Sequence, residues 1–134
     1  MTAILSGAEK AWLVERATKI IDKVGHMRNQ ASQLRNMMQV AGEESEISVL
    51  INYLNYQAAR QATRRFWEKI HGDVRQTLEE ANQRFGEDTR QAAVQHLFGY
   101  MVRHYTYLTE LVNRQSYGGG HKYQGQSKRK GGQR

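Results

Sequence analysis

The chain has 134 residues and a formal net charge of +7, and it contains neither cysteine nor proline. This length suits a single domain with its own core, and the absence of cysteine excludes disulfides and thiolate metal sites. The mean hydropathy is −0.78, and no apolar run approaches the length needed to span a membrane. Because the N-terminal residues also lack signal-peptide features, we expect a cytoplasmic protein with no membrane partner.

We predict five helices, because glycines divide the chain into segments with helical apolar spacing and no segment alternates like a strand. Ser6 and Glu9 form a capping box at the start of the first helix, and Asp73 and Asp88 are expected to cap the last two. The expected ranges are 7–24, 28–41, 43–71, 73–85 and 88–115. The fold class is therefore all-α, with one bundle domain over residues 1–115.

The apolar positions of the first, second and fourth helices are expected to form the core. They are Leu13, Ala17, Ile20, Ile21, Val24, Ala31, Leu34, Met38, Ala41, Val74, Leu78, Ala81 and Phe85. Their spacing of three and four residues places them on one side of each helix.

The helix expected over residues 43–71 has two unlike faces. One is an apolar stripe made of Ile47, Leu50, Ile51, Leu54, Ala58 and Ala62. The roughly opposite stripe consists of Tyr53, Tyr56, Arg60 and Arg64. Guanidinium groups bind phosphate and tyrosine rings stack on bases, so this second stripe indicates a binding surface.

The helix expected over residues 88–115 repeats this pattern. Its core stripe consists of Val94, Leu97, Phe98, Met101, Tyr105, Leu108 and Val112. Its opposite side carries His96, Tyr100, Arg103, Tyr107 and Arg114. The alternative is that both Tyr/Arg faces pack against neighbouring helices, with tyrosine at the edge of the core and arginine reaching out to solvent.

Residues 116–134 are basic and glycine-rich, with five basic residues, no acidic residue and six of the twelve glycines. Such a segment buries too little apolar surface to offset the entropy of ordering, so we expect a disordered tail. Its candidate nucleic-acid contacts are Lys122, Lys128, Arg129 and Lys130. The alternative is a terminus that only keeps the protein soluble, or one that is partly left from expression.

Catalytic and metal-binding patterns are weak. Glu68 and His71 have the Glu-x-x-His spacing of di-iron bundles, but no second copy of that pattern exists. The chain contains no nucleophile elbow, no phosphate-binding loop and no His-Glu-x-x-His motif. We therefore expect no enzyme activity, no metal and no cofactor. A small helical enzyme stays open as a minor alternative.

Four segments follow one another along the chain: Ser32-Gln-Leu-Arg35-Asn-Met37-Met38, Tyr56-Gln-Ala-Ala-Arg60, Leu97-Phe98-Gly-Tyr100-Met101 and Tyr117-Gly118-Gly119. Taken in this order, they resemble the small helical subunit of type III (Csm-type) CRISPR effector complexes. Together they cover residues 32–119. The order of the segments, the chain length and the helical character carry the resemblance.

The resemblance implies a non-catalytic structural subunit of an RNA-guided antiviral ribonucleoprotein. Such a subunit stacks in several copies beside the other subunits and contacts the backbone of the guide RNA and target RNA. By position in the motifs, Arg35 and Arg60 are the implied backbone contacts, and Tyr56 serves either stacking or packing. The stripe pattern, and not the resemblance, adds Arg64 and Arg103. The alternative function is a helical adaptor that binds protein without contacting nucleic acid.

Overall fold

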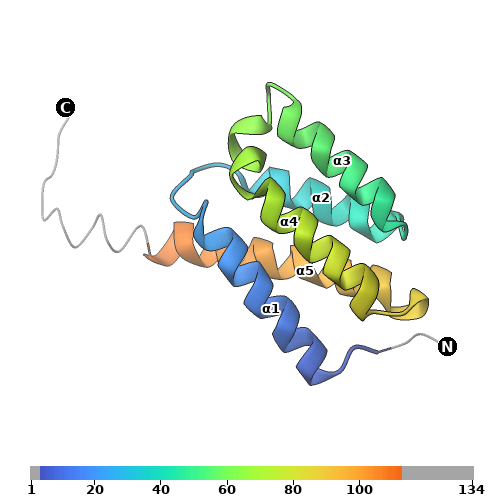
Figure 1. Cartoon of the computed structure of the whole chain (residues 1–134). Coiled ribbons are helices and arrows are strands. Elements are labelled where there is room, and N and C mark those ends of the chain that lie inside the picture. Colours follow the sequence, from blue (N-terminus) through green and yellow to red (C-terminus); the bar gives the residue numbers. More distant parts are fainter. Residues whose placement is uncertain (1–3, 113–134) are drawn as a thin grey trace, which may run out of the picture.

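The computed structural model describes residues 4–112, which form five α-helices and a short π-helical turn (Figure 1). The elements are α1 (Gly7–Asp22), α2 (Ala31–Glu43), α3 (Ile47–Ala59), α4 (Arg64–Arg84), α5 (Glu87–Tyr107) and the π-helical η1 (Leu108–Val112). No strand occurs in this part of the chain, so the predicted all-α class is confirmed. The predicted tail, residues 116–134, lies outside the described residues.

The predicted capping box at the start of α1 is present. The hydroxyl of Ser6 accepts a hydrogen bond from the backbone N–H of Glu9 (3.1 Å), and the Glu9 carboxylate accepts one from the backbone N–H of Ser6 (2.7 Å). Each bond satisfies a donor that the first turn of a helix leaves unpaired.

The prediction of one helix over residues 43–71 was wrong, because the chain turns between α3 and α4. Arg60 has extended backbone angles (φ −69°, ψ 130°) and ends α3. The Thr63 hydroxyl donates to the carbonyl of Gln57 at 2.7 Å and so replaces a helical N–H as its partner. Threonine side chains compete with the helical ladder in this way. Ala62, expected in the core, is exposed in this turn.

The predicted helix end at Gly72 was also wrong, because α4 continues through Gly72 and Asp73. Nothing lies within 4 Å of a Cβ placed on Gly72, and no described glycine has a positive φ. A glycine in a helix interior lowers stability by only about 1 kcal/mol. The buried residues of α4 on both sides of Gly72, from Phe66 to Ala81, offset that loss.

Three smaller boundary predictions need correction. α2 begins at Ala31 rather than 28, after a loop that contains Asn29 with φ 60°. Gly86, not Asp88, is the N-cap of α5, and no side chain caps it. Val112, expected in the core, is 37% exposed, because the helix changes to a π-helical turn at Leu108.

The helices form two layers around one core. In Figure 1, α1, α3 and α4 lie toward the viewer, and α2 and α5 run behind them. The largest fully buried side chains are Trp67, Phe66 and Phe98, and Met37 is buried beside the predicted core residues of α2. Within residues 4–112, no helix has the length and apolarity needed to cross a bilayer.

Candidate nucleic-acid interface

α2 lies antiparallel to α5, and three contacts fix the alignment of the two helices. The side-chain amide of Gln91 donates to the carbonyl of Gly42 at 2.8 Å, at one end of the pair. A Cβ placed on Gly99 would lie 3.6 Å from the sulfur of Met38. At the other end, the backbone N–H of Gln30 donates to the hydroxyl of Tyr105 at 3.0 Å.

Because of this alignment, Arg35 and Arg103 lie at similar positions along the axis of the α2–α5 pair. Arg35 precedes Met38 by one turn, so both side chains project from the same side of α2. Met38 lines a hollow with Tyr100 and Arg103 of α5. Arg35 and Arg103 are both exposed, so the two cations lie on one surface formed by α2 and α5.

A short ladder of rings and cations follows the outer side of α5. The imidazole of His96 stacks on the ring of Tyr100, with 5.8 Å between centroids and 22° between planes. The guanidinium carbon of Arg103 lies 5.6 Å from the centroid of the same ring. His96 and Arg103 are exposed and Tyr100 is half-buried. The prediction that these side chains share one side of the helix is confirmed, while Arg114 lies outside the described residues.

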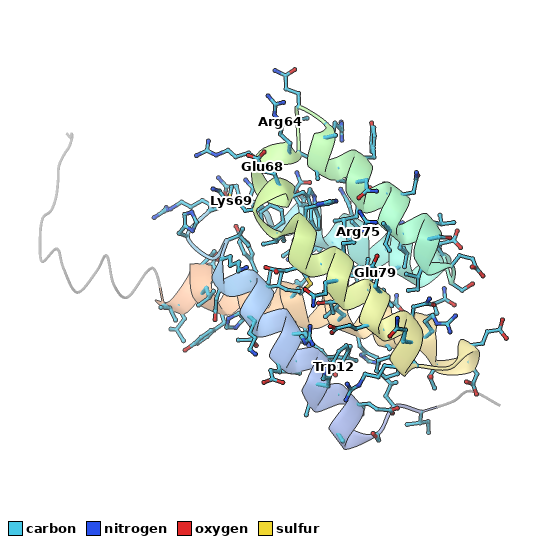
Figure 2. The ribbon with its side chains drawn as sticks, viewed as in Figure 1. Trp12, Arg64, Glu68, Lys69, Arg75 and Glu79 are labelled. Atoms are coloured by element: carbon cyan, nitrogen blue, oxygen red, sulfur yellow. The ribbon has the colours of Figure 1, made fainter. Side chains whose placement is uncertain are left out.

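A second group of the same chemistry lies where α3 ends. The guanidinium carbon of Arg60 is 6.0 Å from the ring centroid of Tyr56, whose side chain is 56% exposed. Tyr53 is half-buried and lines a hollow with Arg60. Arg64 is exposed and opens α4 at the link between α3 and α4 (Figure 2), so it does not continue the α3 stripe as predicted.

The outer side of α2 joins these two groups. Asn36 lines the hollow that contains Arg60, and Met38 lines the hollow that contains Arg103. Arg35 lies between them on α2. We call this surface the arginine face, and it consists of Arg35, Asn36, Tyr56, Arg60, His96, Tyr100 and Arg103.

The arginine face contains no acidic residue. Acids are absent from residues 29–42, 47–67 and 89–109, which supply this face. None of the ion pairs recorded within residues 4–112 involves Arg35, Arg60, Arg64 or Arg103. These guanidinium groups therefore keep their charge available for an external anion. These acid-free stretches are visible in the sequence. They could have indicated that the separately predicted Tyr/Arg faces belong to one surface.

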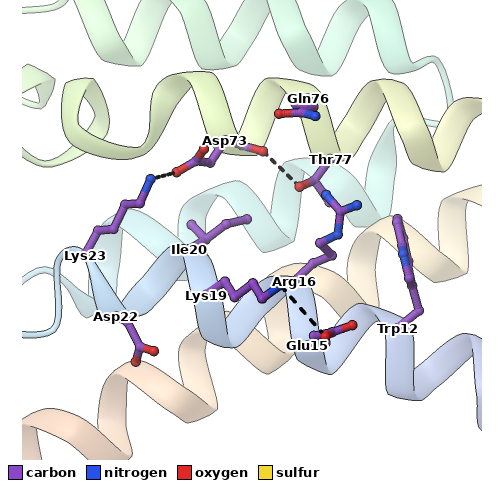
Figure 3. A pocket seen from close by; sticks show the side chains of 10 residues that line it. All are labelled: Trp12, Glu15, Arg16, Lys19, Ile20, Asp22, Lys23, Asp73, Gln76 and Thr77. Carbon is purple, nitrogen blue, oxygen red and sulfur yellow. Dashed lines mark hydrogen bonds and ion pairs between the residues drawn. The ribbon is translucent and has the colours of Figure 1, made fainter.

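Seven of the thirteen acids lie on α1 and α4, and four of these pair with arginine or lysine. Arg16 contacts Glu80 at 2.6 Å, and Lys23 pairs with Asp73 across the two helices. Figure 3 shows the cleft between these helices, with Lys23 reaching across to Asp73 and Lys19 directed along α1 toward Glu15. Arg16, Lys19, Lys23 and Arg75 are therefore each paired with an acid within the chain.

Trp12 closes one end of the same cleft. The guanidinium carbons of Arg16 and Arg84 lie 5.1 and 4.5 Å from its ring centroid, and Phe85 packs 6.0 Å away. Glu15, Asp22 and Asp73 also line this cleft, so it is a less suitable anion site than the arginine face.

The residues weighed for a metal do not gather into a site. His71 contacts the side-chain oxygen of Asn55 at 2.6 Å, and Glu68 is exposed. Within residues 4–112, no group of three or more histidine, aspartate or glutamate side chains could hold a metal ion.

The structure thus brings four of the predicted contact residues, Arg35, Tyr56, Arg60 and Arg103, onto one surface, while Arg64 lies beside it on α4. Lys122, Lys128, Arg129 and Lys130 fall outside the described residues. No family model, curated protein or solved structure matches this chain. The resemblance to the CRISPR small subunit therefore stays a prediction from the sequence.

Proposed function

We propose that this chain is a non-catalytic subunit that binds the backbone of RNA with its arginine face, without reading sequence there. The observation that carries the proposal is that exposed arginines and aromatic rings gather on one surface without any acid. Acids and bases pair on α1 and α4, whereas Arg35, Arg60 and Arg103 have no acidic partner among the described residues. Arginine binds phosphate in bidentate form, and the neighbouring exposed rings suit stacking.

We further propose that the chain acts as the small subunit of an RNA-guided CRISPR effector complex, in contact with guide and target RNA. Three of the four segments that carry the resemblance belong to α2, the end of α3 and α5, which are the elements of the arginine face. Three or four phosphate contacts per copy bind weakly, but several copies along one RNA gain from effective concentration.

The test is a salt titration of RNA binding by the full chain, followed by fluorescence anisotropy. The variant Arg35→Ala/Arg60→Ala/Arg103→Ala should bind RNA less tightly. The slope of log K against log salt should become shallower by about 2, because each of the three lost phosphate contacts contributes roughly 0.7 on a single strand. The matched control Lys10→Ala/Lys19→Ala/Arg75→Ala removes the same charge from the α1 and α4 side and should change the slope much less. Equal effects of the two variants would contradict the proposal.

The tail is tested separately. Changing Lys122, Lys128, Arg129 and Lys130 to glutamine in the full chain measures what these four charges add to the same slope. If neither set of changes affects binding, and the purified protein carries no nuclease-sensitive material that absorbs near 260 nm, the alternative of a protein-binding adaptor is favoured.

A further inference from the structure

A small hollow lies between α2 and α3, beside Arg60. It has a volume of about 240 Å³, below the roughly 300–1,000 Å³ of sites for drug-sized ligands. Its lining is mostly amide and hydroxyl groups, with no acid. The lining residues are Gln33, Asn36, Tyr53, Gln57, Arg60, Ala62 and Thr63. We call it the amide hollow.

Gln57 is the most unusual of these residues. Its exposed fraction is only 6%, yet no described residue forms a hydrogen bond with its side-chain amide. Its backbone carbonyl is already engaged by the Thr63 hydroxyl. The buried side-chain atoms without a partner in residues 4–112 are Oε1 of Glu80 and Nε of Arg90, and the amide of Gln57 is not among them. Its polar atoms therefore reach the open space of the hollow, where they can offer one ligand both a donor and an acceptor.

Gln33 presents further donors to the same hollow. The indole N–H of Trp67 can only donate, and it contacts Oε1 of Gln33 at 3.3 Å. The carbonyl oxygen of this amide is therefore directed to Trp67, which leaves its NH₂ group without an acceptor among the described residues. Asn36 adds an exposed amide at the rim.

Tyr53 and Arg60 supply the remaining parts of a nucleotide site. The half-buried Tyr53 gives the hollow an aromatic side chain on which a base can stack. Arg60 is exposed at the edge, where its guanidinium suits the phosphate that accompanies a base.

We propose that the amide hollow binds an unpaired adenine base, with the amide of Gln57 on the base edge and Arg60 on the adjacent phosphate. Asparagine and glutamine pair with adenine in bidentate form, because an amide offers one donor and one acceptor in the geometry of N6 and N7. For a base within a strand the inference rests on the proposed RNA binding. It adds recognition of one base to a surface that otherwise contacts only the backbone.

The first experiment uses mononucleotides, so it does not depend on binding of an RNA strand. Calorimetry or NMR titration of the full chain should show that adenosine monophosphate binds more tightly than uridine monophosphate, by a factor of about ten or more. Gln57→Leu should abolish this preference without lowering the melting temperature, because the lost amide has no partner within the described fold. The control Gln83→Leu changes an exposed glutamine of α4 and should leave nucleotide binding unchanged. Equal binding of the two nucleotides, binding of neither, or a preference that survives Gln57→Leu would overturn the inference and leave water as the occupant.

The second experiment compares A-rich and U-rich oligoribonucleotides of equal length. Gln57→Leu should weaken binding of the A-rich strand alone and keep the salt slope, whereas Arg60→Ala should weaken binding of both strands and reduce the slope. If the wild type binds both strands equally, the hollow does not read adenine, while backbone binding stands. If no strand binds but adenosine monophosphate does so through Gln57, the hollow stands and the proposed function fails.

Discussion

Arg60 lies over the ring of Tyr56, with 6.0 Å between its guanidinium carbon and the ring centroid, at the residue where α3 ends. The two residues are four apart, so the contact is local to the last turn of the helix. A guanidinium stacked on an aromatic ring keeps its edge N–H groups free, because the contact uses only its planar face. The pair therefore holds a cation in place while leaving its hydrogen-bonding edge open to a phosphate.

This geometry makes arginine and lysine unequal at position 60. Arg60→Lys keeps the charge but loses the planar stack on Tyr56 and the bidentate edge, so RNA affinity should fall, although less than in Arg60→Ala. Neither change should alter the free energy of unfolding by more than about 1 kcal/mol, because an exposed cation–π contact contributes no more than that. Anisotropy and urea denaturation measure the two effects. If the Arg60→Lys variant binds RNA as tightly as the wild type, only the charge matters at this position.

The turn between α3 and α4 depends on the hydroxyl of Thr63. Thr63→Val keeps the shape but leaves the buried carbonyl of Gln57 without a donor, which should lower the free energy of unfolding by about 1–3 kcal/mol. The control Thr106→Val changes an exposed threonine of α5 and should have a small effect. Urea denaturation compares the two. Similar values for both variants would mean that the hydroxyl does not stabilise the turn.

Gly72 and Gly25 should respond oppositely to alanine. Gly72→Ala should raise the free energy of unfolding by about 0.5–1 kcal/mol, since Gly72 lies in an exposed helix interior with open space around its Cα. Gly25→Ala should lower it by about 1–3 kcal/mol, because the new Cβ would overlap Cδ1 of Leu108 and lie only 3.3 Å from its Cβ and Cγ. Thermal or urea denaturation measures both. A loss of stability in Gly72→Ala would favour the helix end that the sequence predicted there.

The sequence predicts the helices and their buried faces well where spacing alone decides. Leu13, Leu54, Leu78 and Leu97 were all placed in the core from periodicity, and all four are fully buried or nearly so. The capping box of Ser6 and Glu9 was readable because both hydrogen bonds are local to one turn.

The turn at residues 60–63 could not be predicted from spacing, because the apolar stripe of α3 continues in register past it. It depends on a hydrogen bond from Thr63 to Gln57 and on the packing of α4 back along α3, seen in the contact of His71 with Asn55. Both are relations between segments. The amide hollow was missed for the same reason, since Gln33 and Gln57 come from different helices.

Tyr105 connects α5 to the loop before α2, and its ionisation should weaken the fold at alkaline pH. Its hydroxyl donates to the carbonyl of Met27 and accepts from the backbone N–H of Gln30. Burial raises the pKa of the Tyr105 phenol above its ordinary value, and the bond from Gln30 opposes this shift only in part. The folded state therefore holds this proton more tightly than the unfolded state, so stability is retained below about pH 10 and falls as the pH rises further.

The measurement is urea denaturation between pH 8 and pH 11 for wild type, Tyr105→Phe and the exposed control Tyr107→Phe. Tyr105→Phe should be less stable near neutral pH by about 1–3 kcal/mol, because two loop groups lose their partner. Above pH 10 it should lose stability less steeply than wild type, since it has no phenol left to ionise at that position. Tyr107→Phe should follow the wild-type curve. If all three curves fall with the same slope, ionisation of Tyr105 does not contribute to alkaline unfolding.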